Sequence, residues 1–173
     1  MPALHDVVVD RPRLLLVGIN PGLRSGALGH HFAGRGNPFW RLLHAARLTP
    51  VLLDFTEDQR LAEFGIALTN LCPRTTRTAA ELTRAEIARG RAALARKIAR
   101  WRPAVVAFVG VSLYRMFFRR VTRGGAGPKP ETISGARVFV VPNPSGLNAS
   151  FPGFAHKLVW FRKLRRFAER PSA

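Results

Sequence analysis

Two continuous apolar segments of this 173-residue chain each lead into an Asn-Pro turn. The first covers residues 14–19 and leads to Asn20, and the second covers residues 138–141 and leads, after one proline, to Asn143. A continuous apolar run suits a strand that is buried on both faces of a helix-covered parallel sheet. Such sheets bind ligands in the crevice beyond the carboxyl ends of their strands. The two turns are therefore predicted to form two walls of one site.

Apolar runs and helical patterns alternate along the chain, which is typical of an α/β domain. The predicted strands are residues 13–19, 65–71, 104–109 and 137–141. Four helices are predicted. One begins after Asn37 and one begins at the capping box that starts at Thr83. The other two cover about 112–119 and 154–168. We expect a single domain over residues 1–173. Its predicted fold is α/β, a three-layer α/β/α sandwich around a mostly parallel sheet of four to five strands.

The segments between these elements are predicted to be loops. Residues 21–36 form a glycine-spaced loop, and residues 124–130, with three glycines and two prolines, form a mobile loop. Residues 1–11 and 169–173 are expected to be flexible ends of the domain. In the last helix, Lys157 is grouped with the surface charges rather than with the apolar face.

The net charge of the chain is +18, from 28 Lys and Arg against 10 Asp and Glu. Such an excess commonly neutralises phosphates with release of counterions, and Arg, which outnumbers Lys, gives bidentate phosphate contacts. Nucleic acid is the partner that we favour. An acidic partner, a membrane surface, or the arginine-rich composition of a GC-rich genome would also account for the charge.

Other bulk features bear on the compartment. No apolar run is long enough to span a membrane, and we expect neither a membrane partner nor a signal peptide. The single Cys72 cannot form an internal disulfide and suits a reducing compartment. We therefore expect a cytoplasmic or nucleoid location.

The chain lacks the residue patterns of several common catalytic and metal-binding sites. His30 and His31 are adjacent and Cys72 has no CxxC partner, so no metal site is expected. The chain has no GxSxG nucleophile elbow and no phosphate-binding loop, so no cofactor is expected either. Acidic residues are scarce near both Asn-Pro turns.

Hydrolysis at these turns must therefore proceed without a strong general base. This is feasible for a reaction with a dissociative transition state, such as cleavage of an N-glycosidic bond to a base that leaves as a stabilised anion. The protein then has to orient water, stabilise the leaving base and exclude solvent. An Asn amide can hold a water but cannot deprotonate it strongly.

Six short motifs occur in a fixed order between about Leu14 and Pro152. They read GINPGL at 18–23, GHHF at 29–32, GNPFW at 36–40, LTNL at 68–71, RTT at 74–76 and NPSGL at 143–147. In sequence, order and spacing this set closely resembles the thymine DNA glycosylase and mismatch-specific uracil DNA glycosylase family. The resemblance implies the uracil-DNA glycosylase fold, which agrees with the fold expected above.

The resemblance also implies a role for each matching residue. Asn20 would be the catalytic residue that positions the attacking water, and Phe32 would stack on the flipped base. The base pocket would comprise Gly18, Ile19, Phe32, Asn37 and Asn70. Contacts to DNA phosphates and the wedge that replaces the flipped nucleotide would come from Ser25, His31, Thr76, Asn143, Ser145, Gly146, Leu147 and Asn148.

The function implied by the resemblance is that of a monofunctional DNA glycosylase of base excision repair. It would flip uracil, especially from G·U mispairs, cleave the N-glycosidic bond and leave an abasic site. No lysine lies in either Asn-Pro motif, so a Schiff-base lyase step is not expected. The expected partner is double-stranded DNA containing uracil or a mispair, bound by a monomer.

One departure and two alternatives accompany this interpretation. The wedge lacks the arginine that family members carry, because Asn148 and Ala149 stand there. A shifted base range, such as hypoxanthine, ethenocytosine or thymine, is the first alternative, and a non-catalytic damaged-DNA-binding protein is the second. Asn37 could also serve as a helix-capping residue, and His31 could also be a neutral side chain that makes a hydrogen bond within its loop.

Overall fold

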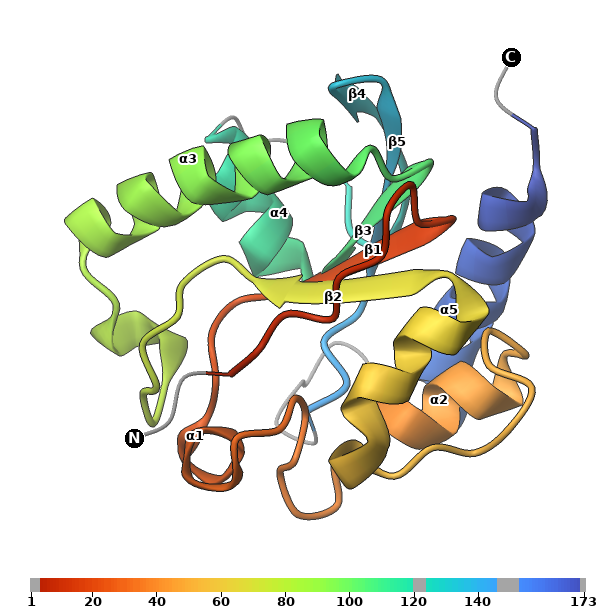
Figure 1. The fold of residues 1–173 in the computed structure, drawn as a ribbon, viewed down its shortest axis with the longest axis horizontal. Helices are drawn as coiled ribbons and strands as arrows, with labels where there is room; N and C mark the ends of the chain where they lie inside the picture. The colour runs from red at the N-terminus through yellow and green to blue at the C-terminus, as the bar shows by residue number, and fades with distance from the viewer. Residues whose placement is uncertain (1–3, 120–123, 146–152, 172–173) are drawn as a thin grey trace.

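A central five-stranded sheet organises the computed structural model, which describes residues 4–119, 124–145 and 153–171 (Figure 1). The strands are β1 Leu14–Gly18, β2 Ile66–Asn70, β3 Val105–Val109, β4 Gly127–Ile133 and β5 Ala136–Val141. They lie in the order β2-β1-β3-β5-β4; β1, β2, β3 and β5 are parallel, and β4 pairs antiparallel with β5. The predicted mostly parallel sheet is therefore confirmed.

Helices connect the strands and cover the sheet. The α-helices are α1 Leu23–Leu28, α2 Phe39–Ala45, α3 Arg84–Trp101, α4 Val111–Phe118 and α5 Phe154–Glu169, and the 3₁₀ segments are η1 Phe55–Phe64 and η2 Ala79–Glu81. The predicted capping box starts α3: the Thr83 hydroxyl accepts a bond from the Glu86 amide, and the Glu86 carboxylate accepts one from the Thr83 amide.

Alternation along the strands places apolar side chains on both faces of the sheet. In β1, Leu14 and Leu16 belong to the core on the side of α2 and α5, whereas Leu15 and Val17 belong to the core on the side of α3 and α4. All five residues of β1 are buried. The predicted three-layer sandwich is therefore present, with α3 and α4 on one side and α2 and α5 on the other (Figure 1).

The N-terminal segment lies against the sheet, although residues 1–11 were expected to be a flexible end. Val7 is fully buried and pairs with Leu68 through two backbone hydrogen bonds of 2.9 and 3.0 Å. The Arg11 amide donates to the Trp101 carbonyl at 2.8 Å. This pairing covers the outer edge of β2, which would otherwise present unpaired backbone groups. At the other end, Glu169 is the last residue of α5.

Two predicted loops contain regular structure. Residues 23–28 form α1 within the glycine-spaced loop. Residues 127–130, expected in a mobile loop, begin the edge strand β4. Pro128 and Pro130 are compatible with an edge strand, because such a strand leaves part of its N–H groups without a ladder partner. The prediction was wrong here because the prolines were taken only as loop signals.

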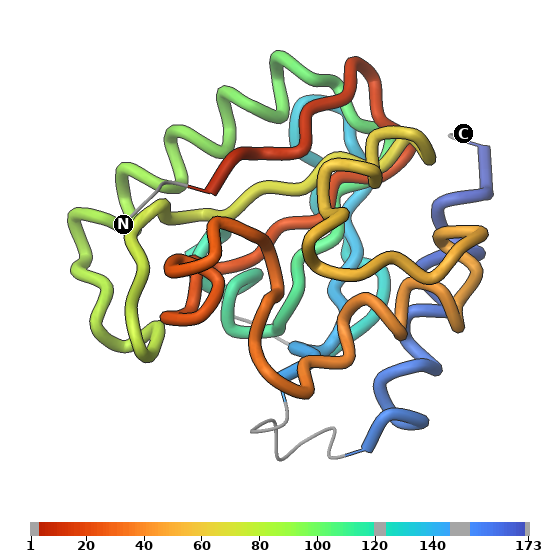
Figure 2. The backbone as a smooth tube through the Cα atoms, turned by 60° about the horizontal axis from the view of Figure 1, so that its bottom comes forward, coloured from red at the N-terminus to blue at the C-terminus, as the bar shows by residue number. Residues whose placement is uncertain are grey.

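The strand order places a switch point between β1 and β3. The chain moves from β1 outward to β2 and then returns to β3 on the other side of β1. Ligand sites of open α/β sheets lie at such a point, beyond the carboxyl ends of the strands. In Figure 2, where the bottom of Figure 1 comes forward, the segment between β1 and α2 runs across the front of the molecule. Every helix in the described ranges is too short or too polar to cross a lipid bilayer.

Candidate active site

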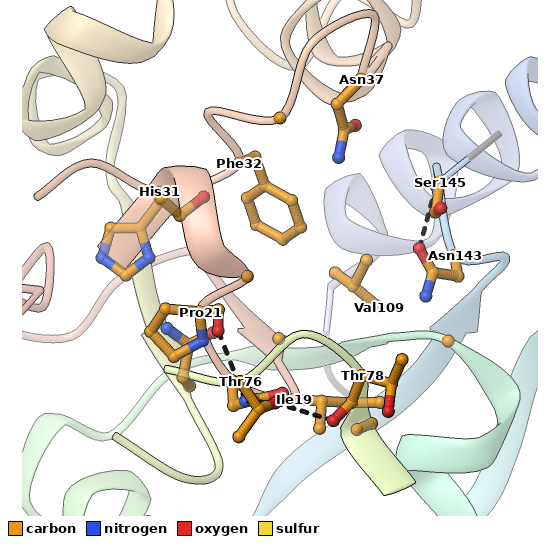
Figure 3. A pocket seen from close by; sticks show the side chains of 18 of the residues that line it. Ile19, Pro21, His31, Phe32, Asn37, Thr76, Thr78, Val109, Asn143 and Ser145 are labelled. Carbon is orange, nitrogen blue, oxygen red and sulfur yellow. Dashed lines mark hydrogen bonds between the residues drawn. The ribbon is translucent and has the colours of Figure 1, made fainter. Parts of the chain in front are cut away.

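A pocket of about 600 Å³ opens at the carboxyl ends of the parallel strands (Figure 3). It brings together all the predicted site residues that the structure describes. They are Gly18, Ile19, Asn20, Ser25, His31, Phe32, Asn37, Asn70, Thr76, Asn143 and Ser145. The predicted wedge residues Gly146, Leu147 and Asn148 lie outside the described residues. The two Asn-Pro turns therefore contribute to one pocket, as the sequence predicted.

The β3–α4 turn forms a part of the pocket that the sequence analysis missed. Strand β3 lies between β1 and β5, so its last residue Val109 and the following Gly110 and Ser112 lie between the two Asn-Pro turns. Gly110 has a φ of +119°, and this glycine lets the chain pass directly from β3 into α4. The position of β3 next to β1 was the missing information.

Gly18 allows the floor of the pocket to close tightly. A Cβ atom on this residue would lie 2.6 Å from the side-chain oxygen of Asn70 and 3.4 Å from the Phe32 ring. Such a contact is too short for any side chain to be tolerated without movement of its neighbours. The absence of a side chain at this position therefore brings two predicted pocket residues close to the backbone of β1.

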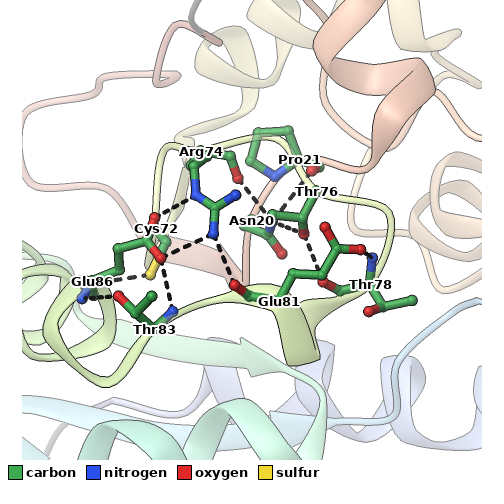
Figure 4. A network of polar contacts seen from close by, with 9 residues as sticks. All are labelled: Asn20, Pro21, Cys72, Arg74, Thr76, Thr78, Glu81, Thr83 and Glu86. Carbon is green, nitrogen blue, oxygen red and sulfur yellow. Dashed lines mark hydrogen bonds and ion pairs between the residues drawn. The ribbon is translucent and has the colours of Figure 1, made fainter.

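The amide of Asn20 is held by three acceptors (Figure 4). Its nitrogen donates to the Arg74 carbonyl at 2.8 Å and to the Thr76 hydroxyl at 2.7 Å, with a longer contact of 3.4 Å to the Pro21 carbonyl. The Thr76 hydroxyl donates its own proton to the Thr78 carbonyl at 2.8 Å, so it must accept from Asn20. The orientation of the amide is therefore determined, and its oxygen is the atom that can accept a hydrogen bond from a water.

The carbonyl of Arg74 is fixed in turn by its own side chain. The Arg74 guanidinium binds the Glu86 carboxylate at 2.5 and 3.0 Å and donates to the Glu81 carbonyl at 2.8 Å. The hydrogen bond from Arg74, together with that from the Thr83 amide, lowers the pKa of Glu86 to about 2. The carboxylate is therefore ionised at neutral pH, and the ion pair ties the segment that holds Asn20 to the start of α3 (Figure 4).

Phe32 presents an aromatic ring inside the pocket (Figure 3). Its ring stacks on Phe39, with centroids 3.8 Å apart and planes inclined by 17°. Phe32 has a φ of +50°, a conformation that costs energy for a residue with a side chain. Because Phe39 covers one face, the opposite face is the one available to a planar ligand.

The backbone on both sides of Phe32 is bonded to side chains, which holds this conformation. The His31 amide donates to the buried Asp58 carboxylate at 3.0 Å. The Ala33 amide donates to the Ser25 hydroxyl at 3.0 Å, and the Ala33 carbonyl accepts from Arg24 at 2.8 Å. Hydrogen bonds to the residues before and after Phe32 therefore hold its unusual backbone conformation, and the stacking on Phe39 positions its ring.

Three residues predicted to contact phosphates are buried within the pocket wall. Ser25, His31 and Thr76 are 6%, 2% and 3% exposed. The His31 ring is hydrogen bonded to the His5 carbonyl at 2.8 Å, and burial lowers its pKa, so the ring is neutral at pH 7. The structure gives each of the three a bond inside the protein. Their phosphate contacts stay predictions.

Amide and hydroxyl side chains make up most of the described polar lining. The chain has five asparagines, and four of them, at positions 20, 37, 70 and 143, line the pocket. The Asn37 oxygen accepts from the Phe39 amide at 3.0 Å, and its nitrogen is directed toward the cavity (Figure 3). The N-cap position of α2 is occupied by Pro38, so Asn37 lies one residue before the cap that was predicted for it. In the second turn, the Asn143 oxygen accepts from the Ser145 amide at 2.9 Å.

The pocket has the chemistry expected for a neutral, planar and polar ligand. Among the described residues that line it there is no carboxylate and no lysine. Within the described part of the chain, no group of three or more potential metal-binding side chains is found. An aromatic ring and neutral amides can bind a heterocyclic base, and Asn20 can hold a water beside it without removing its proton.

Comparisons with known proteins agree with this geometry. A family model for the uracil DNA glycosylase superfamily matches residues 5–165. A Schizosaccharomyces pombe protein named G/U mismatch-specific uracil DNA glycosylase is 32% identical over 170 residues, which cover 92% of this chain and 52% of that protein. The chain thus spans about half the length of this curated relative.

A solved structure shares the fold. It is a solution NMR structure from Methanosarcina acetivorans, provisionally described as a uracil DNA glycosylase. It matches with a TM-score of 0.61 and 16% sequence identity, over 94% of this chain and 97% of that chain. At this identity the likeness concerns the arrangement of the sheet and helices alone.

Proposed function

This chain belongs to the uracil DNA glycosylase superfamily, and from that membership we propose that it removes uracil from DNA. In this proposal it is a monofunctional glycosylase that flips uracil out of a duplex, especially from a G·U mispair, and leaves an abasic site. The name of the curated relative supports the preference for G·U. The observation that carries the proposal is that the fixed amide of Asn20 and the ring of Phe32 line one pocket whose described lining has no carboxylate.

Base binding follows from the lining of the pocket. Uracil is planar, and it would stack on the face of Phe32 opposite Phe39. Its carbonyl and imide groups would pair with the amides of Asn37 and Asn70, which both donate and accept hydrogen bonds. Apart from Arg77, the described lining has no ionised side chain, which suits this neutral base.

The cleavage step requires no strong base. A water held by the Asn20 oxygen forms a bond to C1′ of the sugar as the C1′–N1 bond breaks, and the bonding electron pair leaves with uracil as an anion. The water then loses its proton to solvent. Because the transition state is dissociative, the contribution of Asn20 is to place the water on the correct face of the sugar.

The charge of the protein supports DNA as the partner. The net charge is +18, and Arg77 lies at the pocket. Contacts from arginines to the backbone would position the duplex, while the pocket would read the flipped base. We propose that the protein binds double-stranded DNA as a monomer.

Single-turnover excision is the direct test. A duplex with one G·U pair is incubated with excess protein, and abasic sites are revealed by alkaline cleavage of the uracil strand. We expect product with the natural protein, and a loss of about 10²–10³ in rate for Asn20→Ala, while affinity for undamaged DNA is retained. Gln59→Ala removes an exposed amide from η1 and serves as the matched control.

The range of bases that the protein removes is tested with further duplexes in the same assay. They carry hypoxanthine, ethenocytosine or thymine in place of uracil. Excision of one of these without uracil would replace the proposal with the shifted base range. DNA binding without excision of any base would instead support a non-catalytic damage sensor.

A further inference from the structure

Lys157 is buried at the first turn of α5, although its residue type suggests a surface position. Its exposed fraction is 3%. It lies on the same helix face as Phe161 and Leu164, four and seven residues further on, and these three are the buried residues of α5. The grouping of Lys157 with the surface charges was therefore wrong, since its ammonium group lies inside the protein.

The ammonium group bonds to backbone carbonyls. Its nitrogen donates to the Pro144 carbonyl at 3.1 Å and to the Ser145 carbonyl at 3.2 Å. No salt bridge recorded among the described residues involves Lys157. Lysines are rarely buried without a charged partner, because loss of hydration is costly. The two carbonyls are the acceptors that the structure shows for this buried charge, so the position of the ammonium group and that of the two carbonyls depend on each other.

The two carbonyls belong to the second Asn-Pro turn of the pocket. Within this turn the Ser145 amide is bonded to the side chain of Asn143 (Figure 3). The Ser145 carbonyl is bonded to Lys157. Asn143 also packs close to the β3–α4 turn, since a Cβ atom on Gly110 would lie 3.7 Å from it. The turn therefore lies close to the β3–α4 turn on one side and is hydrogen bonded to α5 on the other.

We propose that Lys157 is a positioning residue that keeps the turn of residues 143–145 rigid while DNA is deformed against it. The inference rests on the proposed function. Extrusion of a base breaks stacking and pairing, so the surface that presses on the DNA backbone must not yield. A turn that is free to move would itself be displaced when it presses on the DNA. Less of the binding free energy would then be available to unstack and unpair the base.

Hydrogen exchange of the DNA-free protein tests the anchoring by itself. Lys157→Met keeps the length and apolar stem of the side chain but removes its donors. We expect faster exchange of the Ser145 amide in this variant, by about tenfold. Lys163→Met is the matched control, because Lys163 is an exposed lysine of the same helix. Unchanged exchange at Ser145 in Lys157→Met would overturn the proposal.

Base flipping tests the consequence. The probe is a duplex with a 2′-fluoroarabino-uridine opposite guanine, which resists cleavage, and a neighbouring 2-aminopurine, which fluoresces when unstacked. At saturating protein we expect the flipped fraction to fall by about tenfold in Lys157→Met. Lys163→Met should match the natural protein, and Lys157→Gln, which retains an N–H donor, should recover part of the signal.

The outcomes separate this inference from the proposed function. Flipping by Lys157→Met equal to the natural protein would overturn the positioning role. An equal loss of affinity for undamaged and damaged duplexes would also overturn it, because a merely structural defect has that effect. If Lys157→Met does not fold, Lys157→Gln is compared in its place. Failure of the natural protein to release uracil contradicts the proposed function but leaves the exchange measurement valid.

Discussion

The side-chain nitrogen of Asn20 lies 2.7 Å from the hydroxyl oxygen of Thr76, which in turn donates to the Thr78 carbonyl. A hydroxyl has one proton, and Thr76 uses it on Thr78, so it presents only a lone pair to Asn20. Together with the Arg74 carbonyl, this contact turns the amide nitrogen of Asn20 away from any water and leaves the oxygen for it. A buried threonine thus determines which atom of the proposed catalytic residue can act.

Removal of this hydroxyl is expected to slow cleavage, because the amide of Asn20 loses one of the acceptors that orient it. Thr76→Val keeps the shape of the side chain but loses the acceptor, and one hydrogen bond of about 1 kcal/mol corresponds to a rate loss of about five- to tenfold. Single-turnover excision from a G·U duplex measures it. Thr76→Ser should recover the rate, whereas Thr132→Val, on the exposed edge strand, should have no effect. Equal rates for Thr76→Val and the natural protein would contradict the orienting role.

A methyl group at position 18 is expected to block the pocket. In Gly18→Ala the new Cβ atom would meet the Asn70 oxygen at 2.6 Å, so Asn70 or Phe32 must move. We expect excision to fall by at least about 100-fold, since a displacement near 1 Å of a positioning group has this effect. Gly125→Ala, where nothing lies within 4 Å of the new atom, is the matched control. Full activity of the Gly18→Ala variant would show that uracil does not bind against the part of the pocket that Gly18 forms.

Loss of the aromatic face of Phe32 is expected to weaken binding of the flipped base. Phe32→Leu keeps an apolar contact with Phe39 but cannot stack on a base. Stacking contributes about 1–3 kcal/mol per base, so affinity for a G·2′-fluoroarabino-uridine duplex should fall by about 5- to 150-fold. Affinity for undamaged duplex should not change. Phe167→Leu, on α5, controls for the loss of a ring elsewhere, and an equal loss for both duplexes would argue against stacking.

The ion pair between Arg74 and Glu86 is expected to stabilise the fold until strongly acidic pH. Because the pKa of Glu86 is lowered to about 2 in the folded protein, its contribution is complete above the ordinary pKa of 4.5 and disappears as the pH falls through about 2. The Tm difference between the natural protein and Glu86→Gln should be constant above pH 5 and vanish near pH 2. Thermal melts at several pH values measure it, and a difference that grows in acid would contradict this assignment.

Local sequence patterns predicted much of the site because each motif acts through its neighbours in the chain. The Asn-Pro pattern indicated the start of a helix, and α2 begins at Phe39, whose amide donates to the Asn37 side chain, although Pro38 rather than Asn37 is the N-cap. The motif set also contains ten of the eleven described residues that meet in one pocket, all except Ser25. The β3–α4 turn was missed, because Val109 and Gly110 carry no distinctive side chain and enter the site only through the position of β3 in the sheet.

By itself the sequence determined which segments form the buried parallel strands and where their carboxyl ends lie, because a strand covered on both faces needs an apolar residue at every position. Tertiary structure decided the orientation of Asn20, whose amide is bonded to Arg74, 54 residues away. It also decided the burial of Lys157 and the strand at Pro128. These features depend on which distant backbone groups come within hydrogen-bond distance, and local periodicity contains no information about that.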